Sequence, residues 1–120
     1  MNFKHQLIAL ALGGLLIGSA FAQNPNTVGA GPGVVDPNHP RVNQINRREQ
    51  HQQDRIANGI KSGQLNPGEA RHLEREEWRL KRNEKHDMAR DGGHLTKQDQ
   101  ARLNREANHV SRDIYRDKHN

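Results

Sequence analysis

A seven-residue pattern returns after thirty positions and constrains the fold of this chain. Residues 63–69 read GQLNPGE and residues 93–99 read GHLTKQD. In each copy a glycine suited to ending a helix is followed by a capping residue, Asn66 or Thr96, and by an acid three residues later. A cap with an acid three positions on forms a capping box, which starts helices. The repeat therefore predicts two helix–loop–helix turns and an all-α fold.

Apolar residues recur at helical spacing in three segments. They are Val42, Ile45, Ile56 and Ile60, then Ala70, Leu73, Leu80 and Met88, then Leu103, Ala107, Val110 and Ile114. The first helix is expected to begin near Pro40 and to end at Gly59 or Gly63. The second should run to about Arg90, and the third should fray near Lys118. Short connections make consecutive helices antiparallel, so residues 41–120 are expected to form three antiparallel helices in an up-down-up bundle.

Polar residues interrupt these apolar stripes and leave a second architecture open. The interruptions are Glu49, Gln52, Glu77 and Glu84. Only fourteen of the 98 residues after Ala22 are Leu, Ile, Val or Phe, below the roughly 20% typical of chains with a full core. Helical hairpins that complete their core in a dimer are therefore the alternative. Arg48 and Arg55 lie at heights where they are expected to pair with the glutamates.

The first 22 residues have the pattern of a signal peptide. Lys4 precedes an apolar run over residues 7–17, and Ser19 to Ala22 supply the small residues of a cleavage site. We therefore expect cleavage near Ala22 and a mature chain in the bacterial periplasm or outside the cell. The run is shorter than the roughly 20 residues of a spanning helix. No second apolar run follows, so we expect no transmembrane segment in the mature chain.

Residues 23–40 are expected to form a disordered linker before the helical domain. They hold four of the five prolines and three glycines, without apolar periodicity. Such a composition is typical of flexible segments. The expected organisation is therefore a signal peptide over 1–22, a linker over 23–40 and a helical domain with both repeats over 41–120.

The balance of charge argues against nucleic acid as a partner. Nineteen Lys and Arg stand against fourteen Asp and Glu, a formal net charge of +5. The two signs alternate along the chain, whereas phosphate-binding surfaces need a patch of one sign. After residue 22 the aromatic residues are Trp78 and Tyr115. Trp78 lies off the apolar stripe, where it is either at the edge of the core or an interaction surface for a second subunit or a client.

No arrangement typical of an enzyme is present. The chain has no Cys, and its serines lie outside any nucleophile motif. The repeated loop resembles an EF-hand in spacing, but its first three ligand positions would fall on Met88, Arg90 and Gly92. These side chains cannot replace the oxygen ligands that calcium needs. We therefore expect a non-enzymatic protein without a cofactor.

Histidines offer a weaker metal hypothesis. The start of the first helix, the end of the second and the second loop meet at one end of an up-down-up bundle. This arrangement brings His39, His86 and His94 towards each other as candidate ligands for zinc or copper. The alternative is that they are solvated surface residues.

Two resemblances follow from these motifs. The segments RIANG (55–59), SGQL (62–65), GGHLT (92–96) and SRDIYRDKH (111–119) are similar to an uncharacterised family of small exported proteobacterial helical proteins. Residues 95–99, LTKQD, resemble the LTxxQ motif of the Spy/CpxP periplasmic chaperone family, with Asp99 in place of Gln. The second resemblance implies binding of a protein client on a helical surface.

The function we expect is binding without catalysis. The first hypothesis is an exported helical binding protein of the cell envelope, stress-related or chaperone-like, that acts on a protein client or by self-association as a dimer. The alternative is a periplasmic protein that binds metal through histidines. A purely structural, self-assembling protein is the third hypothesis.

Overall fold

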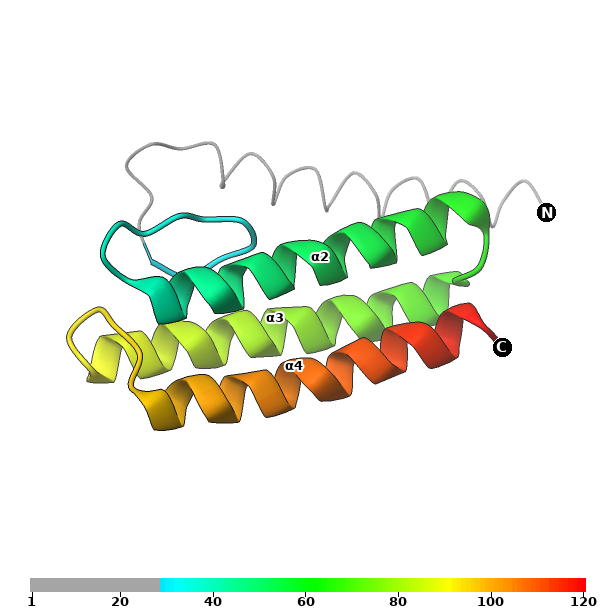
Figure 1. Ribbon diagram of the computed structural model, residues 1–120. Helices are drawn as coiled ribbons and strands as arrows, with labels where there is room; N and C mark the ends of the chain where they lie inside the picture. Colours follow the sequence, from blue (N-terminus) through cyan, green and yellow to red (C-terminus); the bar gives the residue numbers. More distant parts are fainter. Residues whose placement is uncertain (1–28) are drawn as a thin grey trace.

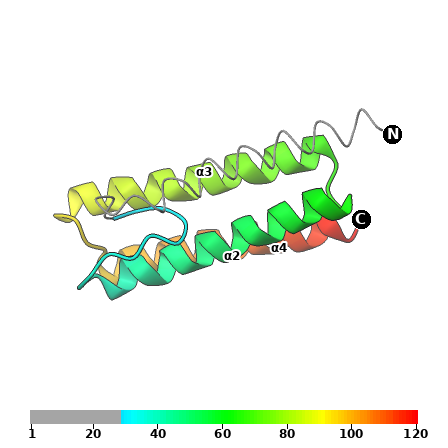
Figure 2. The same cartoon turned by 90° about the horizontal axis from the view of Figure 1, so that it is seen from above.

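The computed structural model describes residues 29–120, which fold into three long helices joined by two short loops (Figure 1). Helix α2 spans Pro40–Ser62, α3 spans Pro67–Arg90 and α4 spans Lys97–Lys118. Each helix contacts the other two. Seen from above, α3 lies to one side of α2 and α4, which overlap (Figure 2). The predicted up-down-up bundle of antiparallel helices is therefore confirmed.

The predicted signal peptide over residues 1–22 lies outside the described residues, as do residues 23–28 of the predicted linker. Within residues 29–120, none of the helices combines the length and the apolar character that crossing a membrane requires.

Both predicted capping boxes are present. The Glu69 amide donates to Asn66 Oδ1 at 2.8 Å, and the Asn66 amide donates to Glu69 Oε1 at 3.0 Å. In the second copy, the Asp99 amide donates to Thr96 Oγ1 at 3.0 Å, and the Thr96 amide donates to Asp99 Oδ2 at 3.1 Å. Each box satisfies two backbone donors that the first helical turn leaves free. The repeat is thus a pair of equivalent helix starts.

Helix α2 continues past Gly59 and stops at the later glycine. Gly63 has a left-handed φ of 78° and donates its amide to Ile60 O at 3.2 Å. Gly59 instead allows a close approach, because a Cβ there would lie 2.8 Å from two side-chain carbons of Leu65. Gly59, the first of the two predicted helix ends, is therefore an internal residue of α2 that lets Leu65 pack closely.

The apolar core is divided into two clusters along the bundle. One consists of Ile56, Ile60, Leu65, Ala70, Leu73, Val110 and Ile114. The other consists of Val42, Ile45, Leu80, Met88, Leu95, Leu103 and Ala107. On α2, Glu49 and Gln52 fall between the two clusters, and both are buried. The predicted stripes are correct, and the polar interruptions are packed within a single chain.

Arg48 and Arg55 act on the core glutamate Glu77 through their charge, which lowers its pKa, but they make their hydrogen bonds to α4. Arg48 Nη1 donates to Asn104 O at 3.2 Å and to Asn104 Oδ1 at 3.0 Å. Arg55 donates to Ser111 Oγ at 2.6 Å and to Ser111 O at 3.0 Å. Both arginines are half-buried at the α2–α4 contact, where they satisfy α4 acceptors while remaining partly in water. Leaving water completely would cost them more.

Residues 29–39 depart from the disorder expected for the linker. They form a loop that packs along the first half of α2 (Figure 1). The buried Asn46 side chain accepts from the Gly31 amide at 3.1 Å and donates to Gly29 O and Val34 O at 2.8 and 2.9 Å. One amide on α2 thereby satisfies three backbone groups of the loop, which explains how a segment without secondary structure is held in place.

Candidate functional site

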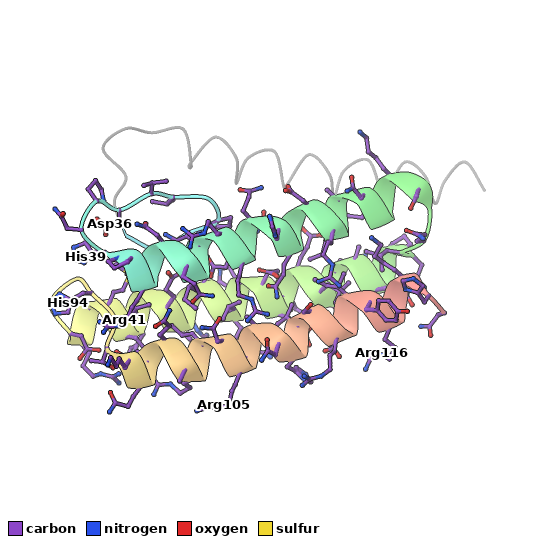
Figure 3. All side chains as sticks on the ribbon, viewed as in Figure 1. Asp36, His39, Arg41, His94, Arg105 and Arg116 are labelled. Atoms are coloured by element: carbon purple, nitrogen blue, oxygen red, sulfur yellow. The ribbon has the colours of Figure 1, made fainter. Side chains whose placement is uncertain are left out.

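Of the three predicted histidine ligands, His39 and His94 lie next to each other at one end of the bundle, and His86 stays apart from them. The rings of His39 and His94 are stacked with their centroids 5.9 Å apart (Figure 3). Stacked rings do not direct their nitrogens to a common point. His86 is exposed, and its Nδ1 lies 3.8 Å from Asp87 Oδ1. Within residues 29–120, no set of three ligating side chains that includes these histidines has its donor atoms within 4.8 Å of one another.

A different group of ligating side chains lies where α3 faces α4. His72 Nε2 lies 3.3 Å from Glu76 Oε2 on α3, and His109 Nε2 lies 3.2 Å from Asp113 Oδ2 on α4. Donor atoms of His72, Glu76 and Asp113 all lie within 4.8 Å of one another. Arg116 Nη1 lies 3.1 Å from Asp113 Oδ1. We call His72, Glu76, His109 and Asp113 the seam cluster.

The seam cluster brings two carboxyls together at low solvent exposure. Glu76 and Asp113 are 8% and 4% exposed. Burial, a hydrogen bond with Asp113 and the charge of Asp113 raise the pKa of Glu76, while His72 and His109 oppose this shift. The sequence reasoning missed this group because it compared histidines only with other histidines. The signal was a histidine followed four residues later by an acid, present once on α3 and once on α4.

A second set of acids lies in the core, and we call Glu49, Glu77 and Glu84 the core carboxyls. Their oxygens are buried, and apart from a backbone contact of Gly31 with Glu84 no donor of another residue type within the described part of the chain reaches them. Burial raises the pKa of Glu49 to about 7 and that of Glu84 to about 10, and the two groups also hydrogen-bond each other. That contact requires one of the two groups to carry a proton. Burial, then the charges of Glu49 and Glu76, raises the pKa of Glu77 to about 9.

Buried acids at the α4 start have cationic partners, and we call Asp87 and Asp99 the end aspartates. Arg102 Nη2 lies 2.8 Å from Asp87 Oδ2 and 2.9 Å from Asp99 Oδ1, and Arg90 Nη2 lies 2.8 Å from Asp99 Oδ1. Burial alone would raise the pKa of Asp99. Hydrogen bonds from Asp91, Thr96 and Arg102 outweigh it and hold that pKa well below its usual range.

The fold separates the two signs of charge that alternate in the sequence. Nine of the fourteen Asp and Glu are buried, whereas none of the eighteen Lys and Arg among residues 29–120 is buried. The alternation along the chain therefore does not carry over to the surface of the described residues. The physical reason is that a carboxyl can be buried in its neutral form, while an arginine stays charged and keeps its guanidinium in water.

The separation of charge is clearest on one exposed side of helix α3, and we call this surface the basic α3 face. It consists of Arg71, Arg75, Trp78, Arg82 and Lys85, all exposed and spaced by three or four residues. The acids of α3 outside the buried set are Glu69, in the capping box, and the half-buried Glu74. Trp78 is 61% exposed, with the Arg82 guanidinium 5.0 Å from its ring centroid. Trp78 is therefore a surface residue and not an edge of the core.

Comparison with known proteins gives no match, whether to a protein family, to a curated protein or to a solved structure. The resemblances of the chain to the exported family and to the Spy/CpxP family stay predictions.

Proposed function

We propose that this is a non-enzymatic, exported binding protein of the cell envelope that attaches to anionic membrane surfaces through the basic α3 face. The observation that carries the proposal is the separation of charge, since the acids are largely buried while the bases remain outside. Signal-directed export, which the first 22 residues predict, would bring this surface to the envelope.

The charge of the face supports an anionic partner. Four basic side chains follow one stripe of α3, and no exposed acid of that helix lies among them. A Lys or Arg near an anionic lipid surface contributes about 1 kcal/mol, and this attraction decreases within a Debye length. Four such residues give about 4 kcal/mol, enough for reversible attachment that depends on salt.

Trp78 favours a membrane over a nucleic acid. An indole has an apolar body and one donor, and such rings are enriched at the level of lipid headgroups. Single-strand binding surfaces stack successive bases on several aromatic rings, whereas this face has one, shared with the Arg82 guanidinium.

The chaperone-like form of the hypothesis receives less support from the surface. Within residues 29–120 the large exposed apolar side chains are Val35, Trp78 and Tyr115. Three single residues provide little of the continuous apolar area by which unfolded clients are held. Suppression of the aggregation of an unfolded client at equal molar ratio is the measurement that would restore this form.

The test is binding to vesicles of phosphatidylcholine with and without phosphatidylglycerol, followed by co-sedimentation and by the fluorescence of Trp78, the single tryptophan of the chain. We expect binding only to the anionic vesicles. The variant Arg75→Gln with Arg82→Gln should bind about 30-fold more weakly, from about 2 kcal/mol of lost attraction.

The matched control removes the same charge from α4, through Arg105→Gln with Arg112→Gln. Both residues are exposed, and Arg105 points away from the bundle (Figure 3). The control should change binding by less than about threefold. Equal losses in both variants would show a diffuse charge effect and contradict the proposed face. Tighter binding to DNA than to anionic vesicles at the same salt would replace the membrane with nucleic acid.

A further inference from the structure

We propose that the seam cluster, His72, Glu76, His109 and Asp113, binds one divalent transition-metal ion of the zinc class. The proposal is independent of the membrane-binding function, because His72 and Glu76 lie on the side of α3 that faces α4 rather than on the basic α3 face.

The first argument is the repetition of one spacing on two facing helices. Side chains four residues apart lie above one another on the same side of a helix. His72 with Glu76 on α3, and His109 with Asp113 on α4, therefore each present an imidazole beside a carboxylate. Together they offer two nitrogen and two oxygen donors, a set that suits Zn²⁺ and other imidazole-binding ions.

The second argument is distance. Zinc bonds of roughly 2.0–2.2 Å in a tetrahedron place neighbouring donor atoms about 3.3–3.6 Å apart. The contacts within the two pairs, 3.3 and 3.2 Å, are already close to this separation. Because donor atoms of His72, Glu76 and Asp113 lie within 4.8 Å of one another, a small closing movement would complete three bonds. His109 lies outside this group of three, and its Nε2 lies 3.2 Å from Asp113 Oδ2, from where the same movement would bring it to the fourth position.

The third argument is the unsatisfied chemistry of the buried carboxyls. Glu76 Oε1 is buried, and the one side chain that hydrogen-bonds with Glu76 is another carboxyl, Asp113. Asp113 is buried beside it, with Arg116 held on Oδ1 and His109 on Oδ2. Two adjacent carboxylates repel each other unless a proton or a cation lies between them. A divalent ion would take the place of that proton and satisfy the free oxygen.

The site also has a route of entry. The side chains of His72 and His109 are 49% and 63% exposed, while those of Glu76 and Asp113 are 9% and 6% exposed. The two carboxyls therefore lie at the buried end of the site, where the surrounding bundle holds them in place. The two imidazoles lie at the surface, where an ion can reach them. No comparable pair occurs elsewhere among residues 29–120: His39 lies 3.9 Å from Asp36 and His86 lies 3.8 Å from Asp87, each without a facing pair.

The experiment is calorimetric titration of the full chain with Zn²⁺ alone in metal-free buffer near neutral pH, alongside thermal unfolding. We expect one ion per chain and a higher unfolding midpoint with zinc, because an ion bound only by the native state stabilises it. Mg²⁺ should not bind, since it prefers six oxygen ligands. The variants His72→Ala and His109→Ala should each weaken zinc binding about tenfold or more.

The matched control is His86→Ala with His94→Ala, which removes two histidines from the other candidate group. Zinc affinity should be unchanged in this control. Both seam histidines are half-exposed, so circular dichroism should show that their variants remain folded. Glu76→Gln gives a second reading, since it keeps the shape of the side chain and should also lose zinc. Unchanged affinity in the seam variants, loss in the control, or equal binding of Mg²⁺ would each overturn the proposal.

Discussion

The core carboxyls and Asp99, one of the end aspartates, are buried acids of the same bundle, yet their environments favour opposite charge states. Burial dominates at Glu49, Glu77 and Glu84 and raises their pKa values. At Asp99 the hydrogen bonds outweigh burial, and the pKa is lowered. The difference lies both in the depth of burial, which is far greater for the core carboxyls, and in the hydrogen-bond donors within reach of Asp99. Hydrogen bonds from Asp91, Thr96 and Arg102 hold Asp99 ionised. The charges of Lys81, Arg48 and Arg55 also act on the core carboxyls, but there they do not outweigh burial.

The position along the helix explains which acids receive a cation. Arg90 and Arg102 lie at the last turn of α3 and the second turn of α4, where their half-exposed side chains reach the end aspartates from the water side. Glu49 and Glu77 lie between the two apolar clusters along their helices, and Glu84 lies between Leu80 and Met88 of one cluster. A guanidinium there would have to leave water, and such a buried pair often fails to recover its desolvation cost. A neutral carboxyl is the less costly solution for the middle of a narrow core.

The difference between the core carboxyls and Asp99 should have its largest effect on how the free energy of unfolding depends on pH. A carboxyl whose pKa is raised in the folded state binds its proton more tightly there than in the unfolded chain. Its contribution is therefore fully present below the unfolded pKa and lost as pH rises through the folded value. The free energy of unfolding should decrease from about pH 5 to pH 9, by up to about 1.4 kcal/mol per pH unit for each core carboxyl still protonated. Urea denaturation measures this slope.

Asp99 should act in the other direction. Asp99 has a lowered pKa, so its contribution is present above the unfolded pKa and lost as pH falls below it. Stability is thus expected to be highest at mildly acidic pH and to decline on both sides. Constant stability between pH 5 and pH 9 would mean that the core carboxyls are already ionised in the folded state.

Asp99→Ala tests the paired side of the comparison. The change removes two guanidinium contacts and one arm of a capping box. We expect a loss of about 2–3 kcal/mol of unfolding free energy at neutral pH. Thr96→Ala is the control, because it removes the cap and leaves the guanidinium contacts, at a cost of about 1 kcal/mol. Equal losses in the two variants would assign the effect of Asp99 to capping alone.

Glu77→Gln tests the core carboxyls, and we expect it to have the smallest effect of these variants. The amide keeps the shape of the side chain and cannot ionise, so stability should be nearly unchanged near pH 5. Near pH 8 the variant should be more stable than the parent by about 1.4 kcal/mol or more, the equivalent of one pKa unit. Asp54→Asn, at an exposed position of α2, should show no such dependence. A destabilised Glu77→Gln at pH 8 would contradict a neutral core.

Most of the secondary structure could be predicted because its signals are local. The capping residues Asn66 and Thr96 act on amides within three positions, and Gly63 ends α2 through its own φ angle. The choice between Gly59 and Gly63 was not local, since it depended on the packing of Leu65 against α2. The boundaries of the helices were thus largely accessible, and the role of an internal glycine was not.

The sequence by itself determined three helices, two of them started by capping boxes, with their apolar stripes and the polar interruptions within them. The tertiary structure alone decided that the acids turn inward while the bases stay outside, and that Glu76 meets Asp113 across α3 and α4. The physical reason is that burial and pairing depend on residues brought together from distant positions. With few apolar residues to fill the space between three helices, carboxyls complete the core, because protonation lets them leave water where an arginine cannot.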